Sequence, residues 1–278
     1  MMNRRSFAGQ LAGAAILFPT LARASSRLTF TGSTEQGGLV VGRAEPGARV
    51  TVDGRNVLVS PEGLFVFGIS YDHTAPIAVN ASYTDGTSET QNITPIVRKY
   101  EIQIVTGLPQ KFVTPPPEDV ARIKAEHARL AEARRADTPE IWFSEPFDWP
   151  FPGVVSGVYG SQRIDNGVPM APHLGVDIAA PSGTPIHAPA GARVAIAEPY
   201  FLEGNFTMLD HGHGVFSEYL HQSAFKVKVG DIVQRGDVIG LVGQTGRATG
   251  PHSHWGLNWF DVKLDPSLIT RTPLPPRA

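Results

Sequence analysis

The sequence predicts a mainly β protein in which two folded units are joined by a helical linker. At 278 residues the chain is longer than one typical domain. Short apolar stretches alternate with turn signals along most of it, and 29 glycines and 24 prolines supply those turns. A segment rich in Ala, Glu, Arg and Lys, at about residues 118–135, breaks this pattern and has the composition of a helix.

Residues 1–24 have the pattern of a signal peptide. Arg4 and Arg5 precede an apolar run over residues 7–21, and small residues surround the cleavage site expected after Ala24. The paired arginines resemble a twin-arginine signal, but ordinary secretory signals also carry such pairs, so both export routes stay open. Glycine and proline interrupt the short run, which argues against a retained membrane span. We expect an exported protein of the periplasm or cell envelope.

Charge and cysteine content restrict the partners and the cofactors. Removing the signal peptide takes away three arginines, which leaves 21 basic against 26 acidic residues and a net charge of -5. This balance argues against a nucleic-acid partner. The chain has no cysteine, which excludes disulfides and thiolate ligands. Any metal site must therefore use His, Asp or Glu.

Residues 25–107 are expected to form a small β-sandwich. About seven short apolar stretches are separated there by turn signals such as Asp53-Gly54 and Asp85-Gly86. This spacing is typical of an immunoglobulin-like sandwich, although the segment has no Cys-Trp-Cys signature. We find no catalytic constellation in it.

Residues 108–139 are expected to form a linker with a helix at about 118–135. A proline run over residues 115–117 precedes the expected helix, and proline is favoured at the first turn of a helix. The apolar positions, Val120 and Leu130 among them, form only a thin stripe, which indicates a helix lying against a neighbouring domain. His127 on this helix is interpreted as a surface residue.

Residues 140–270 are predicted to form a second β unit, followed by a tail over residues 271–278. This unit contains seven of the nine histidines. Three segments carry the residues with metal-binding or proton-transfer chemistry: His173-Leu174-Gly175-Val176-Asp177, Glu218-Tyr219-Leu220-His221 and Gly250-Pro251-His252-Ser253-His254. Side chains two apart in a strand point to the same face, so His252 and His254 can share one site.

One aspartate and two histidines supply the three protein ligands of a catalytic zinc site, and further histidines can serve proton transfer or oxyanion stabilisation.

With these motifs, the segment from about Trp149 to Pro266 resembles the lysostaphin/LytM zinc endopeptidases. The resemblance implies an antiparallel β peptidase domain whose groove holds one Zn²⁺ ion. It assigns His173, Asp177 and His254 as metal ligands and gives His221 and His252 catalytic roles. Three further segments look like family landmarks: Ser156–Gly160, Ala180–Pro185 and Val229–Gly240.

The function implied by the resemblance is that of an exported zinc metalloendopeptidase. Its substrates would be amide bonds in peptidoglycan stem or cross-link peptides, with zinc-bound water as the nucleophile. Two positions depart from many relatives: Trp255-Gly256 follows His254, and Gln222 follows His221. These departures bear on the shape of the groove and on substrate preference.

Two other functional readings stay open. Some relatives in envelopes have lost zinc ligands, so the chain could be a non-enzymatic envelope regulator that binds the wall or activates a separate amidase. Alternatively, the N-terminal unit or the linker helix covers the groove until the protein meets an envelope partner or the wall.

Several other residues with functional side chains are interpreted as structural or as having no function. His211-Gly212-His213 repeats the spacing of the metal pair but looks like a strand end followed by a glycine turn, with His213 near the groove. Tyr159 is read as a packing residue, and Arg163 is either a groove residue or a solvated one. His73 and His187 are assigned no function. The stretch 227–242 resembles a biotinyl or lipoyl carrier hairpin but has no lysine at a suitable tip.

Overall fold

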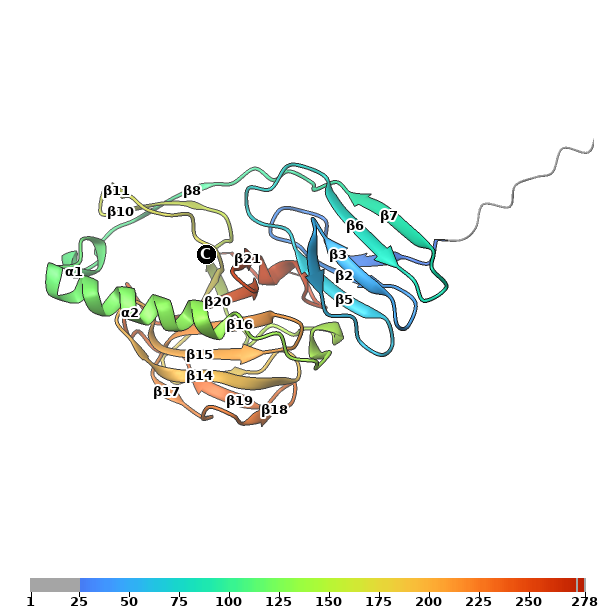
Figure 1. Cartoon of the computed structure of the whole chain (residues 1–278). Coiled ribbons are helices and arrows are strands. Elements are labelled where there is room, and N and C mark those ends of the chain that lie inside the picture. The colour runs from blue at the N-terminus through green and yellow to red at the C-terminus, as the bar shows by residue number, and fades with distance from the viewer. Residues whose placement is uncertain (1–25, 274, 278) are drawn as a thin grey trace, which may run out of the picture.

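The computed structural model describes residues 26–273 and 275–277 (Figure 1). The signal peptide expected over residues 1–24 lies outside the described residues. Strands dominate the described part, which confirms the mainly β prediction. No helix among the described residues is long and apolar enough to cross a membrane.

The N-terminal unit consists of two antiparallel sheets whose facing side chains form one core. The first sheet has the strand order β1 (Thr29–Gly32), β2 (Leu39–Arg43) and β5 (Leu64–Gly68). The second has the order β4 (Arg55–Val57), β3 (Arg49–Val52), β6 (Ile77–Ser82) and β7 (Ser88–Ile93). Burial alternates along β6, where Ile77, Val79 and Ala81 face inward. They join the same core as Phe65 and Phe67 of the first sheet.

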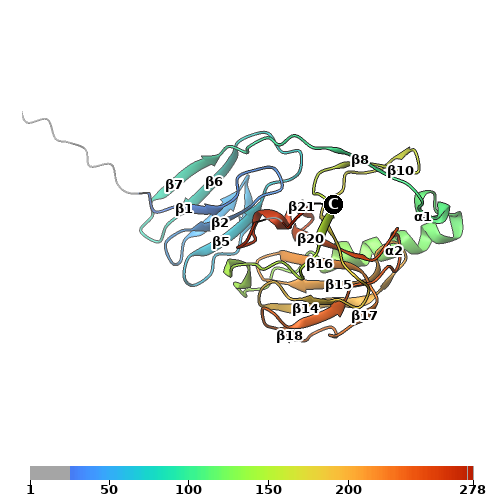
Figure 2. The ribbon, with the colours of Figure 1, turned by 180° about the vertical axis from the view of Figure 1, so that it is seen from behind.

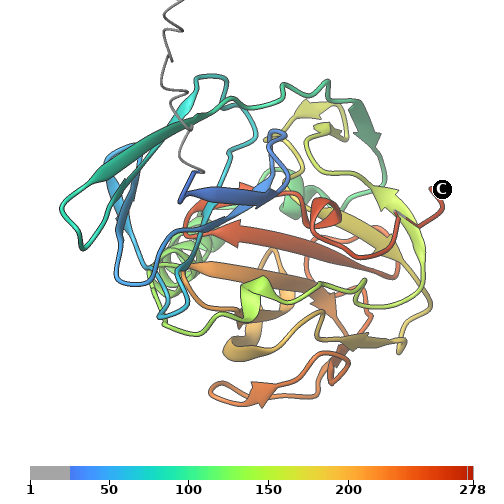
Figure 3. The same ribbon diagram turned by 90° about the vertical axis from the view of Figure 1, so that its right-hand side faces the viewer.

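The C-terminal unit is built on an eight-stranded antiparallel sheet. Its strands lie in the order β18 (Ile232–Val233), β14 (Ala192–Tyr200), β15 (Gly204–Asp210), β16 (Val215–Gln222), β20 (His252–Trp259), β12 (Val176–Ala179) and β9 (Val154–Gly157), and β21 (Val262–Leu264) also pairs with β20. A smaller sheet has the order β13 (Pro185–His187), β19 (Val238–Leu241) and β17 (Ala224–Phe225). Figure 3 shows the large sheet beside the N-terminal unit. Single 3-10 turns, η1 (Trp142–Ser144) and η2 (Pro266–Leu268), flank this unit in sequence.

Strand β8 (Ile102–Val105) differs from the expected organisation. We expected this stretch to belong to the sandwich of residues 25–107. Instead, β8 pairs in parallel with β10 (Gln162–Asp165), which forms a hairpin with β11 (Val168–Pro169) in the C-terminal unit. The backbone groups of β8 are thus satisfied by the edge of a strand from the other unit, and the chain has left the N-terminal sheets before residue 102.

The two units are joined by buried polar contacts. Arg98 Nη1 donates to Asp265 Oδ2 at 2.8 Å, and the Asp265 side chain is almost fully buried. The Tyr159 hydroxyl donates to the Lys263 carbonyl at 2.8 Å, and its ring packs edge-on against Tyr71. Tyr159 is therefore a packing residue at the junction of the units.

Helix α2 (Pro117–Ala133), which follows the short helix α1 (Gln110–Val113), lies along the large sheet in both Figure 1 and Figure 2. Proline occupies its first turn together with Glu118 and Asp119, which suits the positive end of a helix. Leu130 is 3% exposed. It packs in a separate apolar cluster with side chains of the sheet: Ile196, Tyr200, Phe206, Met208 and Phe216.

A buried carboxylate fixes the end of this helix to the sheet. Glu218 on β16 accepts hydrogen bonds from Arg134 Nε at 2.8 Å, from Asn258 Nδ2 at 2.6 Å and from Lys263 Nζ at 2.9 Å. Burial alone would raise the pKa of Glu218, but the positive charges of Arg134 and Lys263 hold it well below the usual range. The ionised carboxylate therefore stabilises the folded state.

Replacing Glu218 by Gln should cost stability in a pH-dependent way. We expect Glu218→Gln to lower the free energy of unfolding by about 3 kcal/mol at pH 7, because two half-buried cations lose their buried counter-charge. The folded pKa is depressed, so the contribution is complete above the unfolded pKa of about 4.3 and declines below it by about 1.4 kcal/mol per pH unit. Urea unfolding of both proteins at pH 7 and pH 3 measures this difference. A difference that does not change with pH would contradict the assignment, and Glu132→Gln, on the exposed face of α2, is the matched control.

Candidate metal centre and active-site groove

The pairing of β12 with β20 brings an aspartate and a histidine together. The two strands are antiparallel, and Asp177 lies directly opposite His254. Two residues along, Ala179 lies opposite His252, so His252 and His254 project from the same face. His173 comes from the loop just before β12. Neighbouring strands therefore assemble residues that are about 80 positions apart in the sequence.

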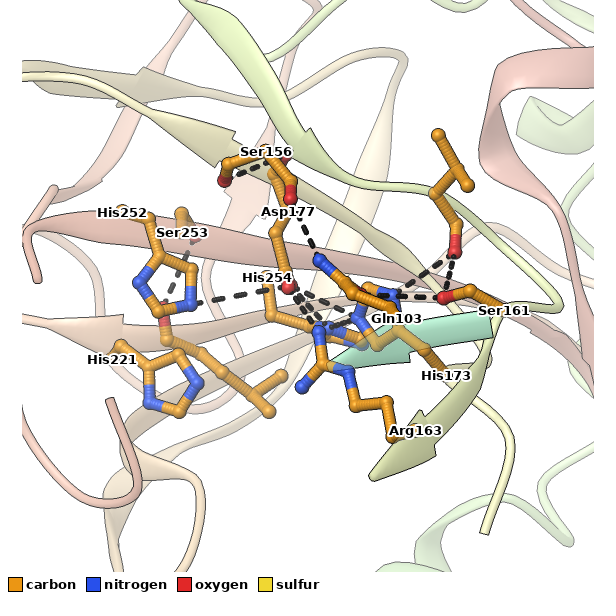
Figure 4. A network of polar contacts seen from close by, with 12 residues as sticks. Gln103, Ser156, Ser161, Arg163, His173, Asp177, His221, His252, Ser253 and His254 are labelled. Carbon is orange, nitrogen blue, oxygen red and sulfur yellow. Dashed lines mark hydrogen bonds and ion pairs between the residues drawn. The ribbon is translucent and has the colours of Figure 1, made fainter. Parts of the chain in front are cut away.

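Three donor atoms converge on one point (Figure 4). His173 Nε2 lies 2.8 Å from His254 Nδ1 and 3.0 Å from Asp177 Oδ1. His254 Nδ1 lies 2.9 Å from the same Asp177 oxygen. His173 Nδ1 contacts the Val158 carbonyl at 3.1 Å, which places the proton on Nδ1 and directs the Nε2 lone pair toward the cluster. Two imidazole nitrogens and one carboxylate oxygen form a donor set that fits zinc.

Two glycines make room for the ligands. A Cβ atom on Gly175 would lie 2.3 Å from His254 Nε2, and a Cβ atom on Gly157 would lie 2.5 Å from Asp177 Oδ2. No side chain fits at such distances. Gly175 lies between His173 and Asp177 in the sequence, so the first motif supplies two of the candidate donors and the space for the third.

The charge states suit metal binding at neutral pH. Burial opposes ionisation of Asp177, but the neighbouring His173 and the Arg163 guanidinium hold the pKa of its carboxyl well below the usual range. Burial lowers the pKa of His254 to about 4. A deprotonated carboxylate and a neutral imidazole are the forms that bind a metal ion.

His221 and His252 form a pair beside the donor set. Their ring centroids are 4.7 Å apart, and His252 Nε2 lies 3.9 Å from Asp177 Oδ1. His221 Nδ1 contacts the Thr245 carbonyl at 2.8 Å, and His252 Nδ1 contacts the Gly250 carbonyl at 2.9 Å. These contacts keep the protons on Nδ1 and leave both Nε2 atoms free for chemistry.

His221 is held in an unusual state for a histidine. Its backbone φ of 65° lies in the left-handed region, which residues other than glycine adopt only at a cost in conformational free energy. Burial, together with the neighbouring His252 and His254, lowers the pKa of His221 well below the usual value. A neutral imidazole fixed in this way presents the Nε2 lone pair as a proton acceptor.

Two hollows adjoin the donor set. The first, of 260 Å³, contains Asp177, His221 and His254 and is bounded by His127, Leu130 and Arg134 of the linker segment. The second, of 400 Å³, lies between β8 and the loop before β20. Four residues line both hollows: Arg163, Asp165, Asp177 and Arg247. The candidate metal centre therefore lies within a groove that extends to either side of it.

The structure brings together all five residues that the resemblance singled out, and it adds others. The Arg163 guanidinium forms an ion pair with Asp177 Oδ2, so Arg163 is a groove residue. His127 is exposed, as expected for a surface residue, and it also lines the first hollow, 3.3 Å from a carboxylate oxygen of Glu203. The sequence had no signal for these contacts because they join separate segments of the chain.

The other histidine pair is structural. His211 is buried, contacting the Gly191 carbonyl and Ser217 Oγ at 2.8 Å each. His213 packs against Phe143 and lines neither hollow, so its expected place near the groove is wrong. The residue lies in the turn between β15 and β16, where its backbone N–H donates to the Thr138 carbonyl at 2.9 Å.

The fold and this site define a metal-dependent hydrolase of the peptidase type. The sequence profile of "Peptidase family M23" matches residues 171–266. A crystal structure of a putative peptidase M23 from Pseudomonas aeruginosa is 32% identical, with a TM-score of 0.66, and the alignment covers 85% of this chain and 95% of that one. The chain belongs to peptidase family M23, which confirms the resemblance, and zinc is the cofactor of this family.

Curated relatives are similar over the C-terminal unit. Peptidoglycan DD-endopeptidase ShyA of Vibrio cholerae is 43% identical over 88 residues, which are 32% of this chain and 20% of ShyA. ShyB of the same organism is 30% identical over 137 residues, covering 49% of this chain and 32% of ShyB. DD-carboxypeptidase/endopeptidase Mpg of Neisseria meningitidis is 46% identical over 83 residues, covering 30% of this chain and 19% of Mpg. The chain thus spans a third or less of these relatives.

Substitution of Gly175 by Ala should weaken zinc binding while leaving the fold intact. The added methyl group would displace the His254 ring, and we expect the zinc affinity to fall at least about tenfold. Competition with a fluorescent zinc chelator measures the affinity, and circular dichroism checks the fold. Gly250→Ala, where a Cβ atom meets open space, is the control. Unchanged zinc affinity in Gly175→Ala would contradict the placement of His254 in the donor set.

Proposed function

We propose that this protein is an exported zinc endopeptidase that hydrolyses amide bonds in peptidoglycan stem or cross-link peptides. The observation that carries the proposal is the convergence of a His-Asp-His donor set with two further histidines inside a groove. Relatives named as peptidoglycan DD-endopeptidases support the substrate class. The predicted signal peptide supports the periplasm or envelope as its location.

In this proposal His173, Asp177 and His254 hold the metal. When bound, zinc would lower the pKa of a water molecule toward 7 and polarise the scissile carbonyl. Arg163 orients Asp177 by binding the carboxylate oxygen that faces away from the other ligands.

His221 and His252 carry the proton transfers and stabilise the oxyanion. Each ring presents a free Nε2 atom, because Nδ1 is occupied by a backbone carbonyl. The two rings lie against each other beside Asp177, so a ring can accept a proton from the attacking water at Nε2 and, once protonated there, donate that N–H to the developing charge.

The N-terminal unit is proposed to be immunoglobulin-like, because its seven strands form two antiparallel sheets around one core. A wall-binding regulator without hydrolase activity is the competing function. The complete donor set favours the hydrolase, since a regulator needs neither zinc ligands nor the paired histidines.

Two substitutions separate metal binding from catalysis. We expect His254→Ala to lose both bound zinc and activity. His252→Ala should keep one zinc per chain and lose about 10²- to 10⁴-fold in kcat, because only proton transfer or oxyanion stabilisation is removed. Zinc content is measured by elemental analysis, and activity by the release of peptide fragments from purified peptidoglycan.

Chelation of the wild-type protein should abolish fragment release, and added zinc should restore it. Wild-type activity in His254→Ala would refute the proposal. Zinc-loaded wild-type protein that releases no fragments would favour the regulator.

A further inference from the structure

Arg247 lies where the two hollows of the groove meet. Its side chain is half-buried. Among residues 26–273 and 275–277, no hydrogen bond or ion pair engages its guanidinium group, whereas Arg163 beside it is paired with Asp177. A cation this close to the donor set, with its hydrogen-bonding groups turned into a groove, is available to a ligand.

The backbone of Arg247 is fixed in place. Its N–H donates to the Leu202 carbonyl at 2.8 Å. The preceding residue, Gly246, has a φ of 69°, and a Cβ atom there would lie 2.4 Å from the Gly204 nitrogen. The carbonyl oxygen of Thr245, in the same loop, accepts a hydrogen bond from His221 Nδ1. One loop therefore sets the position of both Arg247 and His221, so a ligand of Arg247 is held at a fixed distance from the catalytic pair.

The electrostatics of the site favour an anion. Half-burial removes part of the hydration that a guanidinium normally has, and this burial lowers the pKa of Arg247. Asp165 and Glu203 face it, but each lies beyond ion-pair distance. With its four histidines counted as neutral, the first hollow is lined by four arginine and lysine residues and four acidic residues, so a bound divalent cation would leave it with a net charge of +2.

We propose that Arg247 binds a free carboxylate of the substrate peptide beside the scissile amide, and so selects acidic peptides. The inference rests on the proposed function and deepens it. A guanidinium group matches a carboxylate with two parallel hydrogen bonds, which gives both affinity and orientation. Arg163, on β10, lines the same stretch of the groove but is paired with Asp177, which leaves Arg247 as the guanidinium available to the carboxylate.

The test compares two defined cross-linked muropeptides that differ only in the carboxylates next to the cross-link, free in one and amidated in the other. We expect the zinc-loaded wild-type protein to prefer the free acid by about 10- to 100-fold in kcat/KM, mainly through KM. Arg247→Gln should lose this preference by raising KM for the acid alone. Arg247→Lys should keep part of it, because the charge remains and the paired geometry is lost. Arg49→Gln, an exposed arginine on β3, is the control of equal charge change.

Binding of both muropeptides to the zinc-loaded His252→Ala protein, with and without Arg247→Gln, gives a readout independent of turnover. If the protein binds the free acid more tightly than the amide, and Arg247→Gln removes this difference, the inference is supported. A wild-type protein that cleaves neither peptide would refute the proposed function but not this inference. Equal affinity for acid and amide, or a preference that survives Arg247→Gln, overturns it.

Discussion

The register between β12 and β20 is the constraint on which the rest of the site depends. It sets Asp177 opposite His254 and the small Ala179 opposite His252. A slip of one residue would turn both histidines to the other face of the sheet and separate the ligands. The register is fixed by burial, because Val176 and Ile178 on one strand and Trp255 and Leu257 on the other are buried in the same core. The packing that stabilises the sheet thus also positions the chemistry.

Backbone groups and one arginine complete the site around this register. Carbonyl oxygens of Val158, Thr245 and Gly250 set the ring orientation of three histidines. Asp177 uses one carboxylate oxygen for the ligand cluster and the other for Arg163. These three histidines and Asp177 are therefore each held by an interaction outside the donor cluster, so little reorganisation of them is needed when a substrate enters the groove.

Local patterns predicted the features whose determinants are close in sequence. The mainly β fold followed from short apolar stretches between turns, and the shared face of His252 and His254 followed from strand alternation. The contacts of Arg163, Arg247 and His127 could not be read in this way, because each depends on tertiary pairing. Strand β8 shows the same limit: its apolar residues fit a sandwich, but only the free edge of β10 determines its partner.

X-ray absorption spectroscopy of the zinc-loaded protein tests the central claim most directly. The account predicts a first coordination shell with two imidazole nitrogens, one carboxylate oxygen and solvent oxygen at about 2.0–2.2 Å. It also predicts that the number of imidazole ligands stays at two in the double variant His221→Ala/His252→Ala. A first shell with three or more imidazoles in the wild-type protein, or the loss of one in the double variant, would contradict the account.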